Sequence, residues 1–267
     1  MAHPADGIYK KDGLGYISVG DVLGKTLPLF DPSRANSLQW WRDNWEDATE
    51  ILERATRRGA FIHGEIEIAL TGESVIHAAE RPTYEEMISY NLHEYMTYLD
   101  PLIREIKKEN PCSSLCHPNE FHCSVGSTRG CHTRQFQLLI EKEIYCPYGW
   151  GGTPDLRLMF EGLYTLMDYK SVRSYKEEGV KKEPKPISKY KEAIIQVGGY
   201  ALGHNILAKK IPWMKPIEQG AICICYDWRE PHVHLINKKE LKEAASIFLQ
   251  RFKVYQTLTN SQFPIKL

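Results

Sequence analysis

The sequence predicts an α/β protein with a central mixed β-sheet flanked by helices and an N-terminal helical portion. Stretches of strand formers alternate with stretches of helical spacing from residue 133 onward, a pattern typical of α/β folds. Helical spacing dominates before residue 110. We therefore expect one domain made of a mainly helical part (1–110), a Cys/His-rich loop (110–132) and an α/β core (133–267).

The composition narrows the class of protein. Lys and Arg together number 34, as do Asp and Glu, which argues against coating nucleic acid through bulk charge but permits a local basic groove. The chain has no run of about 18 apolar residues, so we expect no membrane span. The N-terminus lacks the apolar core of a signal peptide, which predicts an intracellular, cytoplasmic protein.

The first part of the chain is expected to be mostly helical. Scattered Gly and Pro precede residue 36, with a short strand or turn expected within 15–23. Residues 36–58 place apolar side chains at helical spacing and predict a helix. We expect its tryptophans, Trp41 and Trp45, to lie in the core.

Two further helical stretches follow. Residues 59–70 predict a second helix, on which His63 and Glu67 lie four apart and share a face. Residues 83–109 carry a continuous apolar stripe and predict one long amphipathic helix, with a kink expected at Pro101.

The Cys/His-rich loop has two interpretations. Seven cysteines in the whole chain is an odd number, which favours reduced thiols over a disulfide framework. The loop is either flexible with free thiols, or ordered by a structural Zn²⁺ within 112–132. The potential ligands are Cys112, Cys116, His117, His122, Cys123, Cys131 and His132. The other cysteines are expected in the core, at 146, 223 and 225.

The expected core begins with a strand and a hairpin. Residues 135–146 alternate as a first strand, on which Glu141 and Glu143 share a face. Residues 154–160 and 163–170 predict a two-strand hairpin, because both are rich in strand formers and Glu161-Gly162 between them suits a tight turn.

Asp155, Asp168 and Lys170 are charged residues within this largely apolar hairpin. Asp155 opens the first strand, whereas Asp168 and Lys170 lie two apart on the second strand and project from one face. Charged groups near a packed sheet cost several kcal/mol in desolvation unless something compensates them. A salt bridge is one compensation. A hard divalent cation held by the two carboxylates is the other.

A helix follows over 187–208, with Gln196 and Tyr200 four apart on one face. Its three glycines each cost about 1 kcal/mol relative to alanine, which indicates close backbone packing, at Gly198, Gly199 and Gly203. The remaining elements are two strands and a closing amphipathic helix, at 221–228, 232–236 and 240–258.

The hairpin, with two flanking motifs, resembles a known family. Thr153-Pro154-Asp155 followed by Asp168-Tyr169-Lys170 resembles the PD-(D/E)xK nuclease signature. Gly59 to His63 is similar to the GxxxH motif of the RecB-like branch, and Gln196 to Tyr200 is similar to its QxxxY motif. The order and spacing agree over residues 50–236. The resemblance implies a restriction-endonuclease-like core.

The resemblance also implies roles for individual residues. Asp155 and Asp168 would hold Mg²⁺ or Mn²⁺, with His63 and the backbone carbonyl of Tyr169 as further ligands. Lys170 would orient the attacking water or stabilise the developing charge.

Nucleic-acid contacts are expected beside this site. Gln196 and Tyr200 resemble family residues that position the strand. Ser171 and Arg173 directly follow the site, in a stretch that carries eight basic and three acidic residues between 170 and 191.

The expected function is that of a metal-dependent DNA exonuclease, which hydrolyses phosphodiester bonds from DNA ends in replication, recombination or repair. The expected partner is single- or double-stranded DNA, in the host cytoplasm if a phage encodes the protein. Two alternatives stay open: a structure-specific or restriction-like endonuclease, and a non-catalytic nucleic-acid-binding module.

Overall fold

The computed structural model describes residues 6–72, 81–110, 138–173 and 187–266. Over these residues the protein is a mixed α/β structure with seven α-helices and two mixed β-sheets. None of the described helices is long and apolar enough to cross a membrane.

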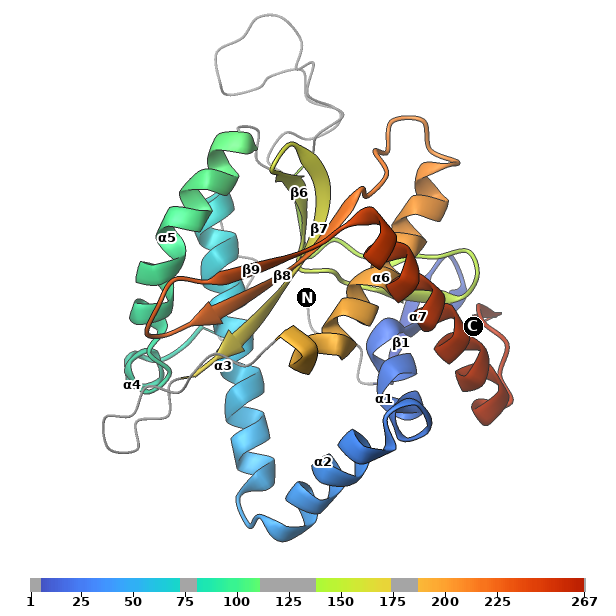
Figure 1. The fold of residues 1–267 in the computed structure, drawn as a ribbon, viewed down its shortest axis with the longest axis horizontal. Helices are drawn as coiled ribbons and strands as arrows, with labels where there is room; N and C mark the ends of the chain where they lie inside the picture. Colours follow the sequence, from blue (N-terminus) through green and yellow to red (C-terminus); the bar gives the residue numbers. More distant parts are fainter. Residues whose placement is uncertain (1–5, 73–80, 111–137, 174–186, 267) are drawn as a thin grey trace, which may run out of the picture.

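The larger sheet has the strand order β3-β6-β7-β8-β9 and lies between two groups of helices (Figure 1). Strands β7 and β8 pair in parallel, whereas the other neighbours are antiparallel. The strands are β3 (Leu139–Ile140), β6 (Leu156–Phe160), β7 (Leu163–Val172), β8 (Gln219–Tyr226) and β9 (His232–Ile236). The flanking helices are α3 (Ala48–Thr71) and α5 (Leu92–Glu109) on one face, and α6 (Lys191–Ala208) and α7 (Lys238–Thr259) on the other.

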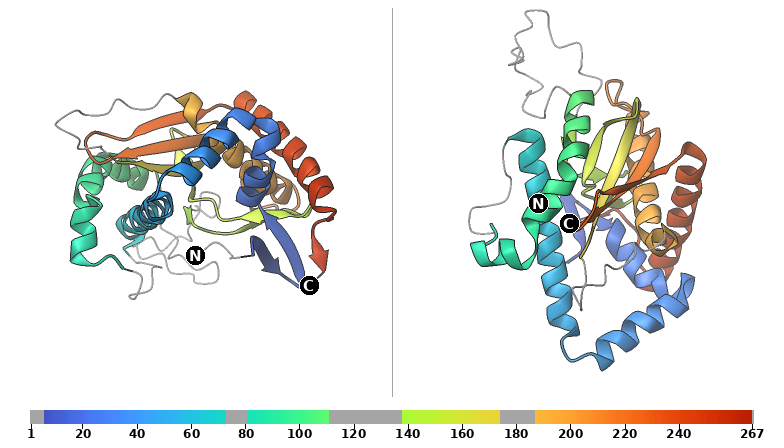
Figure 2. Two further views of the ribbon diagram at one scale, coloured as in Figure 1. Left: turned by 90° about the horizontal axis from the view of Figure 1, so that it is seen from below. Right: turned by 60° about the vertical axis from the view of Figure 1, so that its left-hand side comes forward.

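A second, smaller sheet joins distant parts of the chain. It contains β1 (Ile8–Lys11), β2 (Leu14–Ser18), β4 (Ile144–Tyr145), β5 (Trp150–Gly152) and β10 (Ile265–Lys266). Figure 2 shows the β1–β2 hairpin beside the C-terminal strand, which pairs with β2. The parallel pairing of β2 with β5 brings the first described residues next to the segment that leads into Asp155. β2 confirms the strand expected within 15–23, but the sequence did not predict β1 or these pairings.

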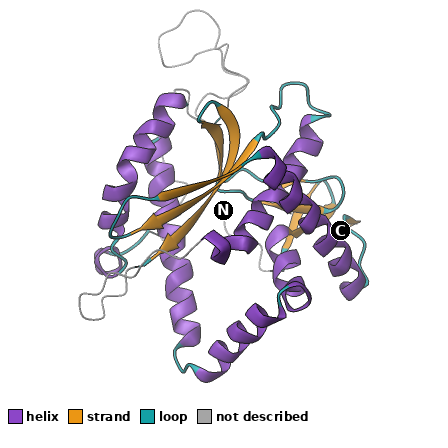
Figure 3. Ribbon diagram, viewed as in Figure 1, coloured by secondary structure: helices purple, strands orange, loops and turns teal. Residues whose placement is uncertain are grey.

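The predicted helix boundaries near the N-terminus were wrong. Helices α1 (Val19–Phe30), α2 (Pro32–Asn44) and α3 follow one another, and α3 continues through Gly59 (Figure 3). The break lies at Trp45, whose backbone is extended. None of the described α2 residues is buried, and Trp45 is 53% exposed, so it does not belong to the core.

The helix expected over 83–109 is two helices, α4 (Tyr84–Ser89) and α5. The break is at Asn91, which has a left-handed φ of 53°, a conformation that Asn tolerates better than most residues. Pro101 lies inside α5.

The strand expected over 135–146 is also divided; its first three residues lie outside the described ranges. Glu141 has a positive φ of 42° and turns the chain from β3 in the larger sheet to β4 in the smaller one. The hairpin that follows is confirmed. Glu161 and Gly162 both have positive φ (50° and 75°), as a two-residue type I′ turn requires.

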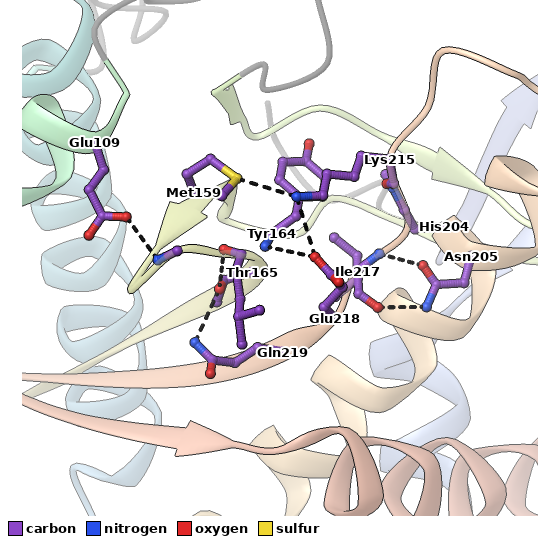
Figure 4. Close-up of polar contacts among 12 residues, drawn as sticks. Glu109, Met159, Tyr164, Thr165, His204, Asn205, Lys215, Ile217, Glu218 and Gln219 are labelled. Atoms are coloured by element: carbon purple, nitrogen blue, oxygen red, sulfur yellow. Dashed lines mark hydrogen bonds and ion pairs between the residues drawn. The ribbon is translucent and has the colours of Figure 1, made fainter. Parts of the chain in front are cut away.

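Hydrogen bonds connect α6 to the segment that leads into β8 (Figure 4). The Asn205 side chain accepts the Ile217 N–H at 2.6 Å, and its amide donates to the Ile217 carbonyl at 3.0 Å. His204 contacts the Lys215 carbonyl at 2.8 Å. These bonds fix α6, and hence Gln196 and Tyr200, relative to the sheet.

The cysteine predictions have mixed outcomes. Cys146, Cys223 and Cys225 are buried, as expected. The Cys/His-rich segment within 112–132, with its potential Zn²⁺ ligands, lies outside the described residues, as does the basic stretch over 174–186.

Candidate functional site

The two aspartates lie where neighbouring strands separate. Pairing of β6 with β7 ends at Leu156 opposite Met167, so Asp155 and Asp168 are the next two residues on the two strands. Asp155 Oδ2 accepts the backbone N–H of Tyr169 at 2.6 Å, which replaces the ladder bond that is lost there. The hairpin register therefore places the carboxylates of Asp155 and Asp168, one from each strand, at the same end of the paired region.

Asp168 is 3% exposed and faces Lys170, whose Nζ lies 2.7 Å from Asp168 Oδ2. Burial raises the pKa of Asp168 to about 6, and the like charge of Asp155 adds to this increase. The Lys170 ammonium lowers the pKa but does not outweigh burial. Burial lowers the pKa of Lys170, but Asp168 and Asp155 outweigh burial and raise it.

His63 approaches this point from α3. Its Nδ1 lies 3.6 Å from Asp155 Oδ1 and 3.8 Å from Glu141 Oε1. Its ring packs edge-on against Tyr169, with centroids 5.8 Å apart. Burial lowers the pKa of His63, but the carboxylates of Asp155, Glu141 and Asp168 outweigh burial and raise it to about 8. At neutral pH His63 is therefore mostly a cation between carboxylates.

Glu141 is a site residue to which sequence reasoning gave no role. The expected strand put Glu141 and Glu143 on one face, but they separate: Glu143 accepts the Tyr145 hydroxyl at 2.6 Å, whereas Glu141 faces His63. The Glu141 N–H also donates to the Asp155 carbonyl at 2.9 Å. The nearby His63 imidazolium lowers the pKa of Glu141, against burial, which raises it. An acidic residue inside a strand-like run was the signal in the sequence.

Gln196 and Tyr200 meet each other through α6, because Gln196 Nε2 donates to the Tyr200 hydroxyl at 3.3 Å. Tyr200 is 5% exposed, and its ring fills the space beside Gly152, where an added Cβ would lie 2.5 Å from Tyr200 Cε1. Burial raises the pKa of Tyr200, and the charges of Asp168 and Asp155 add to this. Both residues therefore lie on the α6 side of the aspartates.

Ser171 and Arg173 continue β7 beyond Lys170. Ser171 Oγ faces Gly59 of α3, where an added Cβ would lie 3.8 Å from it. Arg173 is exposed. One turn beyond His63, Glu67 is 7% exposed.

The donor set can be compared with what a divalent cation needs. In the described part of the chain, no three Asp, Glu, His or Cys side chains converge as a ready-made metal-binding group. The chemistry of the donors nevertheless fits Mg²⁺ or Mn²⁺: two carboxylates lie on neighbouring strands, and an imidazole faces one of them. The fit is in donor type, while Lys170 and His63 occupy the carboxylates in ion pairs.

Comparisons with known proteins add little. No protein-family model and no curated protein matches the chain. A solved structure described as that of SSO0001 is similar with a TM-score of 0.32 and 13% identity, covering 96% of this chain and 80% of the other. At that TM-score and identity, the similarity supports no inference about function.

Proposed function

We propose that the protein is a metal-dependent deoxyribonuclease that hydrolyses phosphodiester bonds from DNA ends, in replication, recombination or repair. One observation carries this proposal: Asp155, Asp168 and Lys170 meet where β6 and β7 separate, with His63 of α3 beside them. The order of the sequence motifs, which resembles the RecB-like branch, gives the reaction class.

The residues of the site have different proposed roles. Asp155, Asp168 and His63 would hold Mg²⁺ or Mn²⁺, and a bound cation supplies countercharge and an activated water for phosphodiester hydrolysis. Lys170, at 2.7 Å from Asp168, keeps an ammonium beside the carboxylates, where it can stabilise the charge that develops on the phosphate. Burial of Asp168 strengthens these interactions because water screens them less.

Cleavage of end-labelled single- and double-stranded DNA with Mg²⁺, Mn²⁺ or EDTA tests the proposal. We expect metal-dependent release of short products and no cleavage in EDTA. Asp168→Ala and Lys170→Ala should each lower the rate by roughly 10²-fold or more. Asp100→Ala is the control, since Asp100 pairs with Arg104 in an exposed ion pair on α5. Full activity of either site variant would contradict the proposal.

Two substrates separate the alternatives. An exonuclease degrades linear duplex but leaves a closed circle intact, whereas an endonuclease cuts both. The close Lys170–Asp168 ion pair also suits a non-catalytic nucleic-acid-binding module. Binding of DNA without metal-dependent turnover would favour that module.

A further inference from the structure

The segment that follows α6 forms a tight turn with a tryptophan at its tip. The Met214 N–H donates to the Ile211 carbonyl at 3.0 Å, which closes a four-residue turn with Pro212 and Trp213 in its central positions. Proline fixes its own φ and favours the first central position of such turns. The sequence therefore directs Trp213 to the end of the turn, where it is 64% exposed.

Hydrogen bonds hold the chain on both sides of this turn. Before it, the Ile211 N–H donates to the Leu207 carbonyl at 3.0 Å. After it, the two hydrogen bonds between Asn205 and Ile217 connect the chain to α6 (Figure 4). The exposed indole is thus presented on a fixed support, so a partner that binds it requires little further ordering of the backbone.

Lysines flank the turn. Lys209 and Lys210 directly precede it, and both are exposed. Neither forms an ion pair with another described residue. Lys215 follows the turn, and its Nζ lies 3.4 Å from Glu218 Oε2. Residues 205–217 contain three lysines and no acidic residue, so two positive charges beside the tryptophan are left uncompensated by this ion pair.

The surroundings of Trp213 favour a nucleic acid over a protein as the partner. A protein interface has an apolar centre from which lysine is depleted, whereas here lysines lie on both sides of a single exposed ring. One face of an indole is enough for a base to stack, and ammonium groups beside it match the backbone phosphates. The bases of a duplex are already stacked on one another, so a single strand suits this surface best.

We propose that Trp213, Lys209 and Lys210 form a binding surface for single-stranded nucleic acid, in which a base stacks on the indole and the lysines contact the backbone. The inference rests on the proposed nuclease function and adds a contact surface outside the catalytic residues. Helix α6 joins the two, because Tyr200 lies about 12 Å along the helix from its last residue, Ala208. A strand held at the site can therefore extend along α6 to this turn.

Anisotropy of fluorescein-labelled single-stranded DNA tests the surface, with a strand of about 20 nucleotides, longer than the about 4–16 that such surfaces cover. EDTA in the buffer prevents cleavage, so binding is measured alone. We expect Trp213→Ala to weaken binding roughly fivefold or more, whereas Trp213→Tyr, which keeps an aromatic ring, should lose less. The double variant Lys209→Gln with Lys210→Gln should reduce the slope of log K against log salt by about one. Binding of the same sequence as a duplex should respond less to Trp213→Ala.

The chain offers a matched control for each part of the surface. Trp40→Ala is the control for the ring, because Trp40 is 63% exposed and lies on α2, at the opposite end of the molecule (Figures 1 and 2). The double variant Lys107→Gln with Lys108→Gln is the control for charge, since it removes another pair of adjacent exposed lysines at the end of a helix. Both controls should bind within twofold of wild type.

Three results would overturn the surface: unchanged binding by Trp213→Ala, equal weakening by either control, or no binding of single-stranded DNA by wild type. A fluorescein-labelled polyglutamate peptide tests the other class of partner. Peptide binding that depends on Trp213, with DNA binding that does not, would assign the turn to an acidic protein instead. DNA binding that depends on Trp213, with no binding of the peptide, would support the proposal.

Cleavage assays with Mg²⁺ keep the two proposals apart. Single-strand binding that depends on Trp213, with no cleavage under any metal, would support the surface and contradict the nuclease function. Cleavage together with binding that is independent of Trp213 would do the reverse.

Discussion

The protonation of His63 is set by its neighbours. Burial alone would lower its pKa, but Asp155 and Glu141 raise it to about 8. An imidazole must be neutral and a carboxyl group ionised to bind a metal ion, so protons compete with a cation at His63 and Asp168. Asp168 loses its proton near pH 6 and His63 near pH 8. Mn²⁺ affinity should therefore rise with pH across this window.

Glu141→Gln should lower the pKa of His63 below about 8, because it removes a negative charge that stabilises the imidazolium. Mn²⁺ affinity at pH 7 should then rise roughly two- to fivefold as the competing proton is lost more readily. NMR titration of the imidazole in metal-free protein measures the first effect, and calorimetry the second. Glu143→Gln is the control, since Glu143 contacts Tyr145 instead. An unmoved His63 titration would contradict the role given to Glu141.

At the residue scale, the sequence predicted the positions of site residues where strand periodicity and turn chemistry determine them. The alternation of β7 fixes Asp168 and Lys170 on one face, and the turn chemistry of Glu161-Gly162 fixes the hairpin. The position of Glu141 in the site was not predicted, because it depends on a left-handed backbone at a non-glycine residue, which local sequence does not specify.

At the element scale, two glycines of α6 lie in close contact with α7, in agreement with the close packing that the sequence indicated. A Cβ at Gly198 would lie 2.6 Å from the backbone N of Ala245, and one at Gly199 would lie 2.8 Å from the Phe248 ring. Both contacts are with α7, which covers α6. Backbone atoms cannot move aside as a flexible side chain can, so Gly198 fixes how closely the two helices approach.

Gly198→Ala should destabilise the protein by roughly 1–3 kcal/mol, because overpacking outweighs the gain in helix propensity. Gly24→Ala on α1 is the matched control: its Cβ would meet no atom within 4 Å of the described structure. That variant should be neutral or more stable by up to about 1 kcal/mol. Urea unfolding measures both. Equal stability of the two variants would contradict close packing at Gly198.

Helix boundaries were less predictable than helix existence. The apolar spacing of 83–109 continues in phase across Asn91, so periodicity alone could not reveal the break between α4 and α5. The reverse error occurred at Gly59, where a second helix was expected to begin but α3 is continuous. A single glycine costs about 1 kcal/mol, which the packing of a 24-residue helix readily offsets.

At the scale of the whole molecule, the smaller sheet could not be derived from local patterns. Its pairing of β2 with β5 joins Ile17 to Trp150, and its pairing with β10 joins Gly15 to Ile265. Such pairs depend on the global arrangement, and their strands are too short for a clear alternation. The larger sheet was more predictable because its strands are longer and carry the motif residues.

A buried polar network connects β6 to α6 and to the segment between β3 and β4. Arg157, which is 3% exposed, contacts His204 Nδ1 through Nη1 at 3.1 Å and donates through Nη2 to the Lys142 carbonyl at 2.7 Å. A guanidinium can only donate, so Nδ1 accepts, and Nε2 carries the proton that is donated to the Lys215 carbonyl at 2.8 Å. The folded protein therefore requires a neutral His204. Burial and the charge of Arg157 lower the pKa of His204 to about 4.

Global stability should consequently depend on pH through His204. Between about pH 6.5 and pH 4 the unfolded chain takes up this proton while the folded protein does not, so acidification favours unfolding. Its contribution to the free energy of unfolding should fall by on the order of 2 kcal/mol from pH 7 to pH 5. Asp168 acts in the opposite direction, because its raised pKa lets the folded protein bind a proton first.

Comparison of variants isolates the His204 contribution from the opposing groups. His204→Asn should be less stable at pH 7 but should lose less further stability at pH 5 than wild type does. His93→Asn, at an exposed position on α5, should keep the wild-type pH dependence. Urea unfolding of the three proteins at both pH values gives the differences. Parallel losses in wild type and His204→Asn would show that the buried imidazole does not link proton binding to the stability of the fold.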